Sequence, residues 1–208
     1  DALTGLPNAH LLEDRVQQAL LQARRNGTHV ALALLDLDHF RFVERTFSQR
    51  HGERLIIEVA RRLRRALRRT DTLARCGTDT FALVLCDLPN ERSALPVLEK
   101  ALAAVRERYQ DGTLTLQLSA TLGVDILPAG TRSPSAALER ADEALRRAKA
   151  NARGGFRFYD AKLDAGMRSR LELEGELLTA APHDPALRKD MHAVGDDVVE
   201  QALVVGDD

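Results

Sequence analysis

Two acidic residues follow the most apolar segment of the chain, where they could bind a metal ion or simply face solvent. Asp36 and Asp38 end a nearly continuous apolar run that begins at His29. Side chains alternate between the two faces of a strand, so both carboxylates share a face if the strand continues that far. Carboxylates are the hard oxygen ligands that divalent cations prefer. The Asp-x-Asp pattern alone fits a solvated strand end at least as well.

Two further groups of residues could act on phosphate or metal. Residues 77–80, Gly-Thr-Asp-Thr, separate two short β-prone runs, and Lys149 and Arg153 stand four residues apart. Lysine and arginine at this spacing lie on one face of a helix, where they can donate to phosphate oxygens. Basic pairs of this kind are also common on solvated helices, so the pair by itself indicates only a surface.

The pattern of apolar residues predicts the elements that carry these groups. Apolar residues recur at helical spacing over residues 11–23 and again over 53–69. Residues 29–37 are too short and too apolar for an isolated helix, which favours a strand buried on both faces. The runs 72–76 and 81–85 predict a hairpin whose tip is the Gly-Thr-Asp-Thr segment.

The second half of the predicted domain continues this mixture of helices and strands. Residues 93–109 have helical periodicity, and residues 114–127 have β-type alternation. Ser133-Pro134 predicts a helix start and Gly154-Gly155 its end. Residues 156–159 predict a last short strand, so the chain is expected to fold as a sheet covered by helices.

Four segments, taken in their order along the chain, resemble the GGDEF domain of diguanylate cyclases. The segment 73–81 (LARCGTDTF) stands where that family has its signature, and 35–40 (LDLDHF) stands on the predicted strand. The opening segment 1–8 (DALTGLPN) and residues 141–153 also fall at family spacing. The resemblance covers roughly residues 1–160. It implies an α/β (α+β) fold with a central, mostly antiparallel sheet flanked by helices, related to the palm of nucleotide polymerases and cyclases.

The resemblance implies a metal site for joining two GTP molecules into cyclic-di-GMP, a reaction that needs two domains facing each other. Asp36, the backbone carbonyl of Leu37 and Asp79 match the family's ligands for Mg²⁺ or Mn²⁺. Asp79 is also the matching catalytic acid. The second glycine and the fourth-position acid of the signature are here Thr78 and Thr80. A threonine hydroxyl cannot replace a carboxylate as ligand or base, so Asp79 alone is expected to be insufficient for turnover.

Several positions match the residues that hold GTP in the family. The guanine-contacting positions have changed to Glu44 and Glu53, and glutamate can accept from guanine N1–H and N2–H but cannot donate to N3. Ordinary exposed helical acids remain the competing interpretation of these two residues. The full set implied for GTP is Arg41, Glu44, Glu53, Gly77, Thr78, Lys149 and Arg153, with Gln49 where the family has histidine.

A second binding site is implied just before the hairpin. Arg68 and Asp71 match RxxD, the family's inhibitory motif for cyclic-di-GMP, and arginine suits it through bidentate donation and stacking on a purine. A solvated face or a simple ion pair is the alternative.

The six arginines of residues 61–69 also permit nucleic-acid binding. The segment lacks stacking aromatics and the net charge is only −1, which argue against that reading.

The two cysteines and the lack of a long apolar run indicate the setting in which the chain folds. Cys76 and Cys86 lack the spacing of a zinc or redox site and are predicted to be reduced structural residues. No apolar run suggests a membrane span, so a cytoplasmic domain without membrane contact is expected.

Residues 161–180 predict a connecting helix like those that lead into EAL phosphodiesterase domains, and residues 181–208 form an acidic tail of unassigned role. The resemblance also implies a sensor domain upstream, an EAL domain downstream and a possible homodimer.

The expected function is therefore a degenerate GGDEF domain of cyclic-di-GMP signalling. It keeps the cyclase fold, has lost most or all catalysis, and binds GTP or cyclic-di-GMP as a regulatory domain. A weakly active cyclase that relies on the surviving carboxylates and basic residues is one alternative. A structural or dimerisation module that binds no nucleotide is the other.

Overall fold

The structure is a computed structural model that describes residues 1–111, 114–131, 133–151 and 153–166. The chain divides into two compact units, Asp1–Asp160 and Ala161–Asp208. Of the second unit, residues 161–166 are helical. The rest of the predicted connecting helix and the acidic tail lie outside the described residues.

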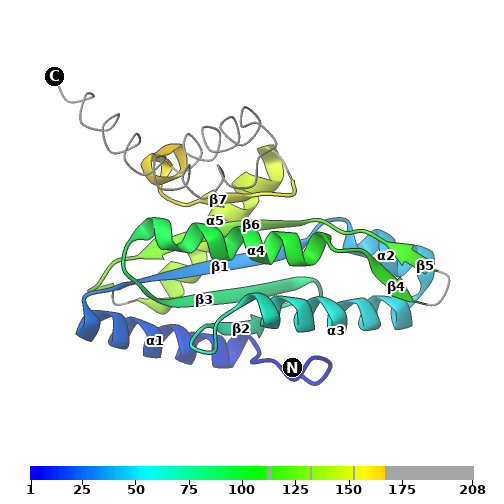
Figure 1. Cartoon of the computed structure of the whole chain (residues 1–208), viewed down its shortest axis with the longest axis horizontal. Coiled ribbons are helices and arrows are strands. Elements are labelled where there is room, and N and C mark those ends of the chain that lie inside the picture. Colours follow the sequence, from blue (N-terminus) through cyan, green and yellow to red (C-terminus); the bar gives the residue numbers. More distant parts are fainter. Residues whose placement is uncertain (112–113, 132, 152, 167–208) are drawn as a thin grey trace, which may run out of the picture. The chain divides into compact units, whose positions relative to one another are not determined.

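A five-stranded sheet forms the centre of the first unit (Figure 1). Its strand order is β2-β3-β1-β6-β7, with β1 antiparallel to both β3 and β6, and β7 parallel to β6. This confirms the predicted mostly antiparallel sheet flanked by helices. The bounds are β1 His29–Leu37, β2 Thr72–Arg75, β3 Thr80–Leu88, β6 Ala120–Leu127 and β7 Phe156–Phe158.

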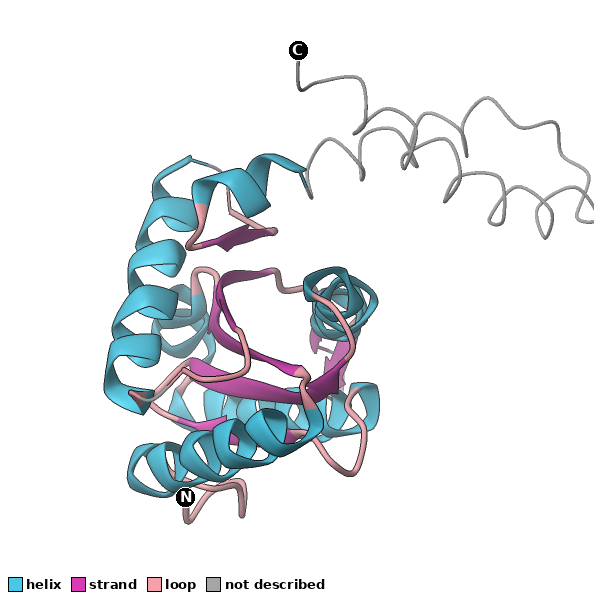
Figure 2. Ribbon diagram, turned by 90° about the vertical axis from the view of Figure 1, so that its left-hand side faces the viewer, coloured by secondary structure: helices cyan, strands magenta, loops and turns pink. Residues whose placement is uncertain are grey.

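Helices cover the sheet, and the strands lie between them in Figure 2. α1 (Ala9–Asn26) and α5 (Pro134–Asn151) pack on one face, where they contact β1 together with β3 or β6. α3 (Gln49–Ala66) packs against α4 (Leu95–Arg106), which in turn contacts β6. α5 begins at Pro134, as the sequence predicted, and Gly27 caps the end of α1 with φ 66°.

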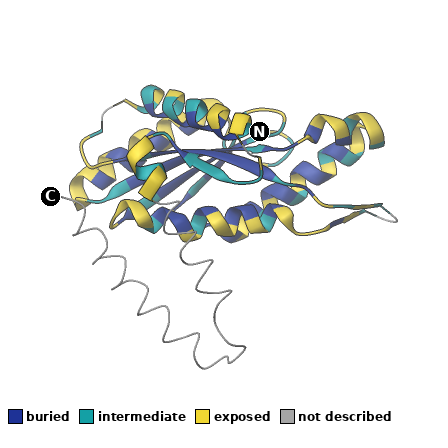
Figure 3. Ribbon diagram, turned by 90° about the horizontal axis from the view of Figure 1, so that it is seen from above, coloured by how far each residue is buried: buried dark blue, intermediate teal, exposed yellow. Residues whose placement is uncertain are grey.

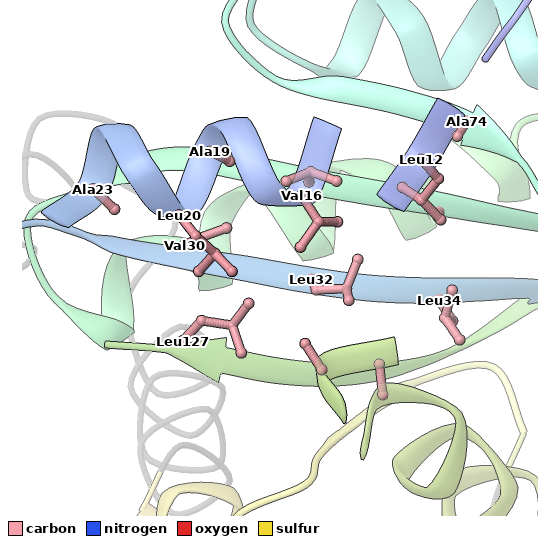
Figure 4. Packing of buried hydrophobic residues seen from close by; sticks show 14 of the residues in the cluster. Leu12, Val16, Ala19, Leu20, Ala23, Val30, Leu32, Leu34, Ala74 and Leu127 are labelled. Atoms are coloured by element: carbon pink, nitrogen blue, oxygen red, sulfur yellow. The ribbon is translucent and has the colours of Figure 1, made fainter. Parts of the chain in front are cut away.

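The long strands β1, β3 and β6 are buried on both faces, as the near-continuous apolar run at residues 29–37 predicted for β1. Figure 3 shows the centre of the sheet in the buried colour and the helices exposed on their outer sides. On one face, α1, α5 and alternate residues of β1 form a single apolar cluster (Figure 4). Its members from β1 are Val30, Leu32 and Leu34, and those from α1 are Leu12, Val16, Ala19, Leu20 and Ala23.

Some elements differ from the sequence prediction. A short helix, α2 (Phe40–Phe47), precedes α3, which starts at Gln49 and not at residue 53. His39 and Ser48, the residues before α2 and α3, have φ of 58° and 99° and provide no side-chain cap, so neither start carries the usual capping signal. Where one helix was predicted over residues 93–109, the chain forms a short 3₁₀ turn (η1, Glu91–Ala94) and then α4. Beyond α4, β4 (Tyr109–Asp111) and β5 (Leu114–Leu116) pair as a separate two-stranded sheet.

None of the helices within the described part of the chain is long and apolar enough to cross a membrane. Cys76 and Cys86 are both partly buried and unpaired with each other. Burial raises the pKa of each thiol to about 11, so both stay protonated at neutral pH and are poor nucleophiles.

Candidate functional site

The end of β1 and the start of β3 bring the predicted metal ligands together. Asp36 pairs with Thr80 in the antiparallel ladder, and the Leu37 amide donates to the carbonyl of Asp79 at 3.0 Å. Backbone pairing therefore brings Asp36, Leu37 and Asp79 together where β1 ends and β3 begins, at one end of these neighbouring strands. This register is the structural basis for any metal or phosphate chemistry at the site.

The Asp36 carboxylate is engaged on both oxygens. Lys149 Nζ lies 2.7 Å from Asp36 Oδ1, and the Thr80 hydroxyl donates to Oδ2 at 3.4 Å. Lys149 belongs to α5, which packs on β1 and β6. Lys149, which was predicted to contact phosphate, therefore neutralises Asp36, which was predicted to bind the metal.

The Asp38 carboxylate has a different environment, because it is buried and held by a complete set of donors. Ser119 Oγ donates to one of its oxygens and Thr121 Oγ1 to the other, each at 2.8 Å. Arg153 Nη1 lies 3.4 Å from the Asp38 oxygen that Thr121 contacts. Gly154 N–H donates to Thr121, which joins the segment after α5 to the same network. Asp38 and Arg153 thus fasten the strand end to the segment after α5.

The hairpin tip does not need the left-handed backbone that a glycine would provide. Neither Gly77 nor Thr78 has a positive φ. The amides of Cys76 and Gly77 both donate to the Thr80 carbonyl, which closes the turn. A glycine at this position can serve either a left-handed backbone or close approach of the backbone to phosphate. Only the second reason applies to this hairpin, and the Thr78 side chain opposes that approach.

A cavity of about 760 Å³ opens beside the hairpin tip. It brings together five of the predicted site residues, namely Arg41, Glu44, Glu53, Thr78 and Asp79, along with Gln49. Its other lining residues are Leu3, Arg45 and Arg75. Gly77, Asp36, Lys149 and Arg153 are not among the lining residues. The predicted nucleotide residues therefore form two neighbouring groups, one around the cavity and one at the end of β1.

Within the cavity, some polar groups already have partners. Gln49 donates its amide to Glu53 at 2.9 Å, so one Glu53 oxygen is engaged. Glu44 packs against Gly52, where an added Cβ would come within 2.9 Å of the Glu44 side chain. Acidic and basic residues both line the cavity, a combination that can accept from the edge of a base and donate to phosphate.

Arg75 is the main functional candidate that sequence reasoning missed. Its side chain lies 3.1 Å from the Asp1 carboxylate and donates to the Thr78 carbonyl at 2.8 Å. Its buried Nε has no partner within the described residues. Arg75 thereby ties the opening segment to the hairpin tip at the cavity wall. The only signal in the sequence was its position beside the signature, since its partner Asp1 is remote along the chain.

The two residues of the RxxD segment are placed differently. Asp71 is buried, and its carboxylate accepts from the backbone amides of Arg68 and Cys86 at 2.9 and 3.2 Å. The Arg68 residue is exposed. Asp71 therefore has a structural task in the turn before β2, while Arg68 is the member that a ligand can reach.

The donor set of the site is small for a divalent cation. No group of three or more His, Cys, Asp or Glu side chains that could hold a metal occurs in the described ranges. Apart from the enclosed Asp38, the described residues at the end of β1 and the hairpin tip offer two carboxylates, Asp36 and Asp79, and Asp36 already pairs with Lys149. Magnesium is often held by one or two carboxylates plus substrate phosphates, so a metal would have to arrive with nucleotide and displace Lys149.

The fold and this site define a helix-covered α/β domain with a polar cavity beside a carboxylate-bearing strand end. The family model described as "Diguanylate cyclase, GGDEF domain" matches residues 1–155, so the chain belongs to the GGDEF family.

Two curated relatives come from Pseudomonas aeruginosa. The chain is 33% identical over 180 residues to the bifunctional diguanylate cyclase/cyclic di-GMP phosphodiesterase MucR, covering 86% of this chain and 26% of MucR. It is 32% identical over 187 residues to the diguanylate cyclase TpbB, covering 89% of this chain and 42% of TpbB. The chain therefore spans less than half of the length of either relative.

Solved structures show the same fold. The isolated GGDEF domain of TpbB superposes with a TM-score of 0.74 at 30% identity, over 78% of this chain and 95% of that one. The GGDEF domain of DgcB from Caulobacter crescentus, solved with cyclic-di-GMP, gives a TM-score of 0.70 at 25% identity, over 77% of this chain and 93% of that one.

Proposed function

We propose that this domain is a degenerate diguanylate cyclase domain that binds GTP in the cavity beside the hairpin and produces little or no cyclic-di-GMP. The observation that carries the proposal is the pairing at position 80. A neutral hydroxyl faces Asp36 where active members of the family have an acid, and Lys149 engages the remaining Asp36 oxygen. Loss of one preorganised electrostatic group commonly slows catalysis about 100- to 1000-fold.

The cavity supports retained nucleotide binding. Glu44 and Glu53 offer carboxylate oxygens to the N1–H and N2–H donors of guanine, while Arg41, Arg45 and Arg75 offer donors to phosphate. In this proposal the bound nucleotide reports GTP to the domains to which this one is linked. A sensor domain upstream and an EAL domain downstream remain predictions, as does assembly into a homodimer.

The test combines a binding measurement with a product measurement on the purified chain. Calorimetric titration with GTP should give binding, and chromatography after incubation with GTP and Mg²⁺ or Mn²⁺ should show no cyclic-di-GMP. Glu44→Ala should weaken GTP about tenfold or more, since a hydrogen bond to a charged group contributes about 1.5 kcal/mol or more. Glu91→Ala, an exposed acid on η1, is the matched control. Absence of GTP binding, or steady product from the wild-type chain, would contradict the proposal.

A weakly active cyclase is the second candidate, and one observation favours it. The backbone register does bring Asp36, Leu37 and Asp79 to one edge, as the reaction requires. If slow product formation is found, Asp79→Ala should abolish it, while a contaminating cyclase would be unaffected by that substitution.

Cyclic-di-GMP is the alternative ligand, and Arg68 is the residue on which to test it. Because the Asp71 carboxylate accepts backbone hydrogen bonds, an Asp71 variant would confound loss of ligand with loss of stability. Arg68→Ala removes an exposed side chain and avoids this ambiguity. Binding of cyclic-di-GMP that is lost in Arg68→Ala would place a second regulatory site there.

A further inference from the structure

The cavity beside the hairpin tip is lined from two helices that are joined by a single residue, Ser48. α2 carries three of the lining residues and the start of α3 carries two. Ser48 lies between Phe47, the last residue of α2, and Gln49, the first of α3. Its backbone angles therefore decide how the two helices, and the side chains they present to the cavity, are oriented to each other.

Ser48 has a backbone conformation that favours glycine. Its φ is 99° and its ψ is 156°. A residue with a side chain is strained at these angles, and such strain persists only where the surrounding structure holds the residue in place. The Ser48 amide donates to the Glu44 carbonyl at 3.1 Å, and the Ser48 carbonyl accepts from the Gly52 amide at 3.2 Å. The end of α2 and the start of α3 thus hold this backbone from both sides.

The side chain of Ser48 has a partner that a glycine would lack. Its Oγ lies 3.0 Å from His51 Nδ1, in the first turn of α3. His51 Nε2 lies 3.9 Å from Asp111 Oδ2 at the end of β4, and Arg54 Nη1 donates to both oxygens of the same carboxylate at 2.8 and 3.1 Å. With a proton on Nε2, Nδ1 is the acceptor for the Ser48 hydroxyl. His51 therefore connects the strained serine to the β4–β5 sheet.

The two helices pack closely beside this junction. A Cβ added at Gly52 would lie 2.9 Å from Glu44 Cγ and 3.4 Å from Phe40 Cζ, so α2 already rests on α3 there. Because one residue joins the helices, a change of the backbone angles at Ser48 would break this contact. It would also separate the side of the cavity that α2 forms from the side that α3 forms.

We propose that Ser48 and His51 are positioning residues for the cavity. The strain at Ser48 opposes the arrangement of α2 and α3 that forms the cavity, and the contact with His51 holds that arrangement. Neither side chain is among those that line the cavity. The inference rests on the proposed GTP binding and adds two residues that set its strength. A ligand binds less tightly when the binding-competent arrangement is only partly populated, so both residues should alter the affinity without touching the ligand.

The test is calorimetric titration with GTP of the wild type, Ser48→Gly, His51→Ala and the double variant. Ser48→Gly removes the strain and should tighten binding about threefold or more. His51→Ala should weaken binding about threefold or more, as expected for loss of one hydrogen bond. Once glycine replaces the serine, the histidine has no hydroxyl to hold, so adding His51→Ala should change the dissociation constant less than about twofold. Equal effects of His51→Ala in both backgrounds, or looser binding by Ser48→Gly, would overturn the proposal.

Two further variants separate the contact with Ser48 from the mere presence of a histidine. An asparagine amide reaches the place of Nδ1 and can pair with the serine hydroxyl, so His51→Asn should bind GTP as the wild type does. His10→Ala, at an exposed histidine of α1, is the matched control and should also leave the affinity unchanged. Affinity lost equally in His51→Asn and His51→Ala would contradict the assigned contact.

Amide hydrogen exchange without ligand distinguishes failure of this inference from failure of the proposed function. His51→Ala should speed exchange of the α2 amides, and it should not do so in the Ser48→Gly background. Melting temperatures establish that each variant is folded. If exchange responds in this way and no variant binds GTP, the proposed GTP binding is wrong and the positioning role stands. If exchange of α2 is the same in all variants, the positioning role is wrong whatever the affinity.

Discussion

The carboxylates of Asp36 and Asp38 stand two residues apart on one strand end and have separate tasks. Asp36 is accessible to Lys149 and to the hydroxyl of Thr80, whereas Asp38 is enclosed by Ser119, Thr121 and Arg153. Asp-x-Asp in this chain is thus one acid paired with Lys149 and one buried structural acid. This division suggests that substitutions at the two positions should affect different measurements.

Asp38→Ala is expected to destabilise the fold. It leaves the buried Thr121 hydroxyl, the part-buried Ser119 hydroxyl and Arg153 without their acceptor, and an unsatisfied buried polar group costs about 1–3 kcal/mol. Urea unfolding should show the midpoint shifted down at an unchanged slope. Asp79→Ala, at a half-buried acid of the hairpin tip, should change stability less than Asp38→Ala does, because it does not remove the acceptor of a buried hydroxyl. Equal stability of the two variants would contradict the structural role of Asp38.

At the scale of elements, the contact between β6 and α5 depends on one glycine. A Cβ added at Gly123 would lie 2.1 Å from the Leu145 amide nitrogen and 2.2 Å from the Ala141 carbonyl oxygen. Both atoms belong to the helix backbone, so the whole of α5, and Lys149 with it, would have to move. Gly123→Ala should therefore cost about 3 kcal/mol or more, at the upper end for overpacking.

Gly155→Ala is the matched control for that substitution. Nothing lies within 4 Å of a Cβ at Gly155, and its φ is not in the left-handed region. Thermal unfolding should leave this variant near the wild type and lower the melting temperature of Gly123→Ala by many degrees. A Gly123→Ala protein as stable as the control would show that the helix can separate from the sheet at little cost.

The ion pairs of α3 predict a pH dependence of stability. Hydrogen bonds from Arg61, opposed by partial burial and supported by Arg62, lower the pKa of Glu58 from 4.5 to about 2. Arg62 also donates to the carbonyls of Glu107 and Arg108, so the group links α3 to the segment after α4. A carboxylate whose pKa is lowered on folding stabilises the fold above its unfolded pKa, and this contribution is lost as the pH falls from 4.5 to 2.

Comparison of the wild type with Glu58→Gln measures this contribution. The wild type should be the more stable at pH 7, and the difference between the urea midpoints should shrink steadily below pH 4.5. Glu91→Gln serves as a control on an exposed glutamate of η1. A difference that stays constant down to pH 3 would mean that Glu58 does not keep its charge through these contacts.

Sequence patterns predicted the helices and strands whose apolar residues repeat at regular spacing. They missed a short helix without a capping signal and the side-chain pairs between residues far apart in the sequence. The run at residues 29–37 gave β1 with its observed bounds, because both ends carry polar or glycine signals. α2 was missed because it is short and its start at His39 has a left-handed backbone without a cap. The pairs Lys149 with Asp36 and Arg75 with Asp1 could not be predicted, since they join segments remote in sequence.

At the scale of the whole molecule, the reaction of the family requires two copies, each presenting one bound nucleotide to the other. This chain keeps the strand register that positions Asp36, Leu37 and Asp79. It differs from the family signature at the hairpin tip, where Thr78 replaces a glycine and Thr80 replaces an acid. If those two residues account for inactivity, restoring them should restore the reaction in the otherwise unchanged fold. The alternative is that changes around the cavity, at Glu44 and Glu53, also prevent it.

The variant that combines Thr78→Gly with Thr80→Glu separates these explanations. Regaining one electrostatic group should raise the rate about 100- to 1000-fold, so cyclic-di-GMP should become measurable by chromatography with GTP and Mg²⁺. Because two copies must meet, the initial rate should rise with the square of protein concentration in dilute solution. Adding Asp79→Ala to the same variant should remove all product. If the double variant binds GTP, stays folded and still forms no product, the loss of activity lies in the cavity or in the pairing of copies rather than at the hairpin tip.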